Sequence, residues 1–142
     1  MNVKLNDLLA NLVAEYHKLQ NMHWYVAGKD FFQAHAKLEE LYDEVNAAID
    51  EVAELILQVG GRPLGSLKAV LAHASIEERA DAYLKSDEVF ALVLADYEAL
   101  LAEVKSVKAA ADAEGCDLVS AAMDGYIAGF SKTIWMLKQQ AL

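Results

Sequence analysis

Residues 30–63 read DFFQAHAKLEELYDEVNAAIDEVAELILQVGGRP, and this stretch decides the fold. Asp30 is a suitable helix N-cap, and Gly60-Gly61-Arg62-Pro63 ends the helix because glycine favours the final turn and proline cannot continue it. Between these two points, apolar side chains recur at helical spacing. They are Phe32, Leu38, Leu41, Tyr42, Val45, Ile49, Val52, Ile56 and Val59. The stretch therefore predicts one long helix over residues 30–59 that buries one face.

The chain on either side continues the helical pattern. It predicts a helix over residues 3–26 that stops near Gly28, and a short amphipathic segment over residues 66–74. Ser86 is a suitable N-cap for a third long helix ending near Ala113, and a fourth begins near Asp117. Four long helices with a short extra helix between the second and third predict an all-α, ferritin-like four-helix bundle with one crossover connection. We expect residues 1–142 to form one such domain.

The composition limits the classes of function. The 142 residues carry a net charge of −10, which opposes nonspecific binding to nucleic-acid phosphates. No apolar run is long enough to cross a bilayer, and no secretory signal is evident at the N-terminus. A lone Cys116 suits a reducing compartment because it has no intrachain disulfide partner. These features lead us to expect a cytoplasmic protein without a membrane partner.

Two imidazoles and three carboxylates form a candidate metal-ligand set: His23, His35, Glu39, Asp50 and Glu54. On a helical wheel with His35 at zero, the other three residues of the long helix fall within about 100° of it. His23 precedes the Gly28 turn by about as much as His35 follows it, so an antiparallel hairpin places both histidines at one level. These ligand types suit one or two iron ions, and Zn²⁺ is a possible substitute.

The spacing of the ligand set raises a question about assembly. Asp50 and Glu54 lie fifteen positions beyond His35 and Glu39, which is about 22 Å along a helix and too far for one site. Either the two halves are unrelated, or one chain's half meets the other half in a second chain. An antiparallel two-fold packing of the long helix, with its axis near Glu44 and Val45, would create two shared sites. A solvated acidic face is the alternative interpretation.

Several segments resemble the Dps-like mini-ferritins, the DNA-protection-during-starvation family of the ferritin superfamily. They are Asn21-Met22-His23-Trp24-Tyr25-Val26-Ala27-Gly28, Phe31-Phe32, His35, Glu40-Leu41-Tyr42, Ile49-Asp50-Glu51-Val52-Ala53-Glu54, Gly60-Gly61-Arg62-Pro63-Leu64 and Ile134-Trp135-Met136-Leu137. The resemblance implies a hollow homo-dodecamer with ferroxidase centres at two-fold interfaces. In that arrangement His23, His35 and Glu39 come from one subunit, and Asp50 and Glu54 from its partner. Glu39 stands where many relatives have Asp.

The resemblance also implies an activity. Such proteins oxidise Fe(II), preferably with hydrogen peroxide, and store the ferric mineral, which protects against oxidative stress. It implies that Trp24 lies near the iron and intercepts stray oxidising equivalents, with core packing as the alternative. Relatives that bind DNA use Lys/Arg-rich tails, and this chain resembles the kind without one, so we expect no appreciable DNA binding. The competing functions are a DNA-coating nucleoid protein of the same fold and a helical assembly without metal chemistry.

Overall fold

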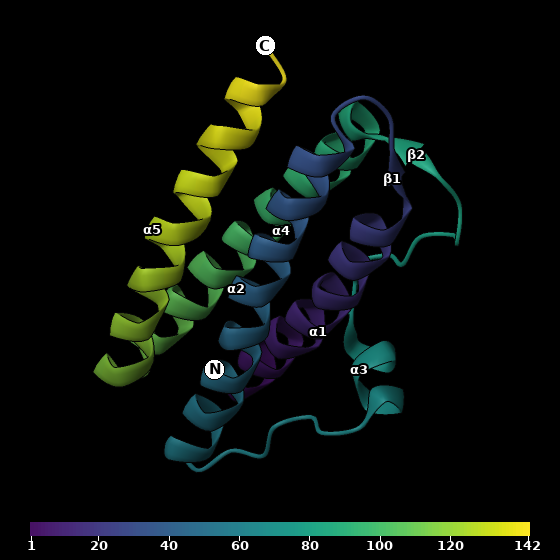
Figure 1. The fold of residues 1–142 in the computed structure, drawn as a ribbon. Coiled ribbons are helices and arrows are strands. Elements are labelled where there is room, and N and C mark those ends of the chain that lie inside the picture. The colour runs from purple at the N-terminus through teal and green to yellow at the C-terminus, as the bar shows by residue number, and fades with distance from the viewer.

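The computed structural model describes all 142 residues and is almost entirely helical. The elements are α1 (Asn2–Tyr25), β1 (Val26–Ala27), α2 (Phe31–Gln58), α3 (Leu67–His73), β2 (Leu84–Lys85), α4 (Ser86–Ala113) and α5 (Asp117–Gln140). The four long helices form a bundle in which α1 packs mainly on α2 and α4 mainly on α5 (Figure 1). The expected all-α bundle, with its short extra helix between the second and third long helices, is confirmed.

The apolar faces of the four long helices meet in one core of 28 buried residues. Leu38, Leu41 and Val52 from the long second helix lie in it, as the spacing predicted. Phe32 was expected on the same buried face, but it is 83% exposed. At about 100° per residue it lies about 120–180° from Leu38, Leu41 and Val52, so it projects from the opposite side of α2, and its apolar character alone led to the wrong assignment. No helix of the structure is both long enough and apolar enough to cross a membrane.

Two asparagine side chains fix the crossover connection between α2 and α4 along α1. Asn11 is buried, and its Oδ1 accepts hydrogen bonds from the backbone amides of Ser75 at 2.8 Å and Ile76 at 3.0 Å. Asn6 Oδ1 accepts from the amide of Leu64 at 2.9 Å. These bonds satisfy backbone donors that the irregular connection leaves without secondary-structure partners. The connection, including α3, therefore packs against α1 and leaves the outer face of α2 uncovered.

A short parallel strand pair fixes the turn between α1 and α2. Val26 lies opposite Leu84 and Ala27 opposite Lys85. Gly28 then turns the chain with φ of 125°, a value that side chains rarely tolerate. Ser86 was expected to be the N-cap of α4, which is wrong: it is the first helical residue, and its hydroxyl donates to Asp30 Oδ2 at 2.5 Å. This bond joins the start of α2 to the start of α4.

The bundle interior contains an unusual polar cluster between α1 and α4. Lys18 Nζ lies 2.9 Å from Asp96 Oδ2, and the side chain of Glu15 is fully buried beside them. Burial raises the pKa of Glu15 well above its usual 4.5, and the hydrogen bond and charge of Asp96 raise it further, whereas Lys18 opposes this shift. A protonated Glu15 can donate to Asp96, whereas a charged one would have two oxygens without a donor.

Candidate metal centre

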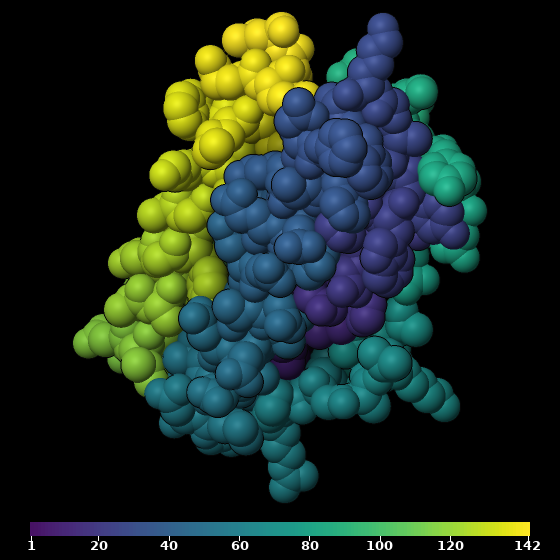
Figure 2. All heavy atoms as spheres, viewed as in Figure 1, coloured from purple at the N-terminus to yellow at the C-terminus, as the bar shows by residue number.

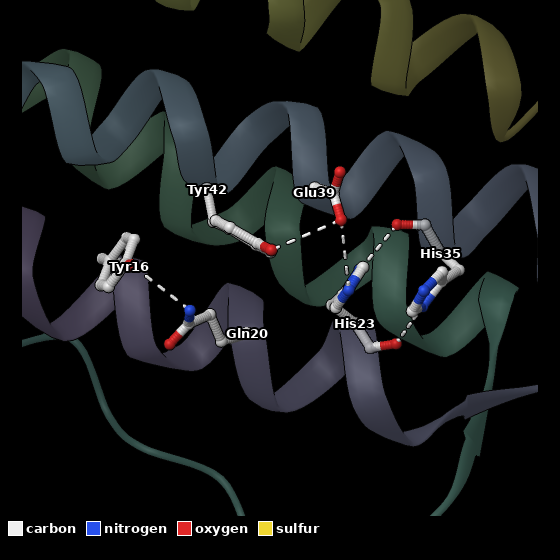
Figure 3. Close-up of polar contacts among 6 residues, drawn as sticks. All are labelled: Tyr16, Gln20, His23, His35, Glu39 and Tyr42. Carbon is white, nitrogen blue, oxygen red and sulfur yellow. Dashed lines mark hydrogen bonds and ion pairs between the residues drawn. The ribbon is translucent and has the colours of Figure 1, made fainter.

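His23 near the end of α1 and His35 in the second turn of α2 hold each other in place. His23 Nδ1 lies 2.7 Å from the carbonyl oxygen of His35, and His35 Nδ1 lies 2.8 Å from that of His23 (Figure 3). The two rings stack with centroids 3.6 Å apart and 14° between their planes. Phe31 stacks on His35, with ring centroids 4.9 Å apart. The helical hairpin therefore brings the two histidines to the same level.

The reciprocal bonds determine which ring nitrogen is free. A carbonyl oxygen only accepts, so each Nδ1 must carry the proton and donate it. In the neutral rings, both Nε2 atoms then keep their lone pairs. A histidine that ligates a metal commonly donates its other N–H to a carbonyl in the same way. Both imidazoles are therefore in the tautomer that binds a cation through Nε2.

Glu39, one turn after His35, is the third predicted ligand that lies near this pair of histidines. Its Oε1 lies 3.7 Å from His23 Nε2. When His23 is neutral these two atoms are both acceptors, so a cation between them would relieve their repulsion. Zn–N and Zn–O bonds are each about 2.1 Å, and their sum of about 4.2 Å exceeds the gap. The gap is therefore short enough for one ion of this size to fit between the two atoms.

Tyr42 is a neighbour of this cluster that helical spacing assigned only to the apolar face. Its hydroxyl donates to Glu39 Oε1 at 3.5 Å, and its ring meets His23 edge to face with centroids 5.2 Å apart. Desolvation raises the pKa of Tyr42, and the charges of Glu39 and Asp43 raise it further, so the hydroxyl stays a donor. The sequence could have revealed this neighbour, because position 42 is seven residues after His35 and falls about 20° from it on the helical wheel.

Asp50 and Glu54 lie far from the histidines of their own chain. Both are on the exposed side of the uninterrupted helix α2, about 22 Å from the His35 end. No group of three or more His, Cys, Asp or Glu within one chain is arranged to hold a metal ion. Figure 2 shows α2, in blue, running along the middle of one face of the molecule between α5 and α1. This face exposes both acidic residues to solvent or to a second chain.

Trp24, next to His23, does not pack in the core of the chain. Its side chain is 63% exposed, so the core-packing alternative is wrong for the single chain. It lines a surface pocket of about 230 Å³ together with His17, Lys18, Asn21, Glu78, Arg79 and Asp81. The proposed redox role of Trp24 stays a prediction.

Known proteins resemble the chain over nearly its whole length. The model of the ferritin family, described as a ferritin-like domain, matches residues 2–141. A DNA protection during starvation protein of Brevibacillus brevis is 40% identical over 136 residues, which cover 96% of this chain and 91% of that protein. Among solved structures, Helicobacter cinaedi CAIP is 35% identical with a TM-score of 0.97, and each chain is fully covered.

A third comparison bears on the chemistry. The crystal structure of a DPS protein from Vibrio cholerae O1, described as a member of a broad superfamily of ferritin-like diiron-carboxylate proteins, has a TM-score of 0.95 to this chain. It is 33% identical and the match covers 99% of this chain and 88% of that one. The matching family model, the identity to these relatives and the shared fold agree with one another. The chain belongs to the Dps-like mini-ferritins of the ferritin family.

Proposed function

We propose that this protein is a ferroxidase that oxidises Fe(II), preferably with hydrogen peroxide, and stores the ferric product inside a hollow dodecamer. Membership of a superfamily that contains diiron-carboxylate proteins supports iron as the substrate. The observation that carries the proposal is the reciprocal bonding of His23 and His35, because it leaves both Nε2 atoms with free lone pairs, and Nε2 of His23 lies 3.7 Å from Glu39 Oε1. Imidazole and carboxylate together suit iron, and Zn²⁺ can occupy the same ligands.

We further propose that Asp50 and Glu54 of a partner subunit complete each site across a two-fold interface. Both residues are exposed on the uncovered face of α2, where a second chain can reach them. Within one chain they belong to no group of three or more metal-ligating side chains, so a metal site that uses them needs ligands from another subunit. Carboxylates stabilise Fe³⁺ more than Fe²⁺ and so favour oxidation. Peroxide takes two electrons, one from each of two ferrous ions, so no one-electron radical is released. In this proposal Trp24, which is exposed next to His23, intercepts stray oxidising equivalents.

Iron oxidation under anaerobic conditions tests the proposal. The assembled protein is loaded with Fe²⁺ without oxygen, and half an equivalent of peroxide is added while the ferric absorbance is followed. We expect fast oxidation by the unchanged protein and a loss of about 100-fold or more in His35→Ala, because a ligand contributes at least as much as the groups that orient it. His73→Ala is the matched control, since His73 is exposed at the end of α3. Oxidation at the rate of buffer alone would instead leave a helical assembly without metal chemistry.

A second measurement separates this function from DNA coating, the role that the names of several relatives suggest. The net charge of −10 per chain makes the assembly anionic, so phosphate binding would oppose its field. We expect no gel shift of duplex DNA at about 0.15 M salt, where the screening length is near 8 Å. A shift that persists at this salt concentration would favour the nucleoid function.

A further inference from the structure

We propose that Tyr42 is a positioning residue that holds the Glu39 carboxylate at the metal site, an inference that rests on the proposed function. Glu39 needs such support because its side chain is 56% exposed, whereas that of His23 is only 6% exposed. An exposed glutamate has three rotatable bonds, and fixing them costs conformational entropy. Its two polar contacts are with the Tyr42 hydroxyl at 3.5 Å and His23 Nε2 at 3.7 Å.

Tyr42 can supply this support because its own ring is held on two sides. It meets His23 edge to face, and it meets Tyr16 in the same way with centroids 5.8 Å apart (Figure 3). These contacts come from α1, whereas Tyr42 and Glu39 lie three positions apart on α2 and so face the same side. The rigid tyrosine therefore directs Oε1 of the flexible glutamate towards His23 Nε2, the pair of atoms between which a cation would bind.

Tyr42 is the main hydrogen-bond donor to Glu39 when His23 is in the neutral, metal-binding tautomer. In the neutral tautomer, His23 Nε2 has no proton to donate to Glu39, so the 3.7 Å contact is not a hydrogen bond. The Tyr42 hydroxyl is then the only protein donor that faces this carboxylate. A hydrogen bond to a ligating carboxylate orients it before the metal arrives, and removing such a partner commonly costs 10- to 100-fold in metal affinity.

A double-mutant cycle tests whether Tyr42 acts through Glu39. Binding of Co²⁺ to the assembled protein is followed by its visible absorption, whose shape reports the ligand geometry. The cycle compares the unchanged protein, Tyr42→Phe, Glu39→Ala and the double variant. We expect Tyr42→Phe to weaken Co²⁺ binding about tenfold and to alter the spectrum. In the Glu39→Ala background the same substitution is expected to change nothing, because the group that it orients is absent.

Tyr16→Phe is the matched control, because Tyr16 belongs to the same aromatic cluster but its hydroxyl bonds only to Gln20. It is expected to leave Co²⁺ binding unchanged. The inference is overturned if Tyr42→Phe binds Co²⁺ as the unchanged protein does, or if it weakens binding equally with and without Glu39, since packing on His23 would then explain the loss. The His23→Ala variant tests the metal function itself. If the unchanged protein does not bind Co²⁺, or if His23→Ala binds it equally well, the proposed metal function fails as well.

Discussion

Co-expression of the His35→Ala and Asp50→Ala chains is expected to restore roughly a quarter of the iron-oxidising activity, although each variant alone is inactive. A site shared across a two-fold axis takes its histidines from one chain and its acidic pair from the other. At an interface between the two variants, one site combines both intact halves and the other combines both damaged halves. Random pairing makes half of the interfaces mixed, and half of the sites at a mixed interface are intact.

A second mixture provides the matched control for this experiment. His35→Ala and Glu39→Ala remove ligands from the same half, so no pairing of these chains creates an intact site. This mixture is expected to stay inactive. Peroxide-driven oxidation of Fe²⁺ is measured for both mixtures after size-exclusion chromatography has shown equal assembly. If the first mixture recovers no more activity than the second, the site is not shared between subunits and the proposed arrangement is wrong.

Replacement of Glu15 by Gln is expected to stabilise the protein by an amount that grows with pH. Glu15 takes up a proton more readily in the folded chain, because burial and Asp96 raise its pKa well above 4.5. Its stabilising contribution is complete below the unfolded-state pKa and is lost as pH rises through the raised folded-state pKa. Between these two pKa values, the free energy of unfolding falls by about 1.4 kcal/mol for each pH unit. Gln is always neutral and can still donate to Asp96, so it escapes this loss.

Urea unfolding at several pH values and a fixed protein concentration measures this difference, because assembly makes stability concentration-dependent. The Glu15→Gln and unchanged proteins should have equal stability near pH 4 and should diverge above it. Glu98→Gln is the control: Glu98 is 51% exposed beside Lys138, and we expect a change within about 0.5 kcal/mol that does not follow the same pH trend. A variant that is less stable than the unchanged protein at pH 7 would show that Glu15 is ionised and paired with Lys18.

Helical spacing predicted the long helices well because each buries a continuous apolar face against the others. The observed limits of α2, Phe31–Gln58, differ by one residue at each end from the expected range of residues 30–59. The same reasoning failed for Phe32 and Ser86. Phe32 was assigned to the buried face by its apolar character, although the helical wheel puts it on the side opposite Leu41 and Val52. The role of Ser86 depended on Asp30, which is 56 positions away in the chain.

The amino-acid sequence by itself determined the four-helix bundle, because the apolar residues recur at helical spacing. It also determined that His23 and His35 lie at the same height in the helical hairpin. The rise along one helix separates Asp50 and Glu54 from them. Only the tertiary structure decided the tautomers of the two histidines, the contact of Tyr42 with Glu39 and the burial of Glu15 beside Asp96. These depend on distances and solvent exclusion between α1, α2 and α4. Spacing along one helix defines a face, whereas hydrogen-bond direction and desolvation are set by the neighbouring helices that pack against it.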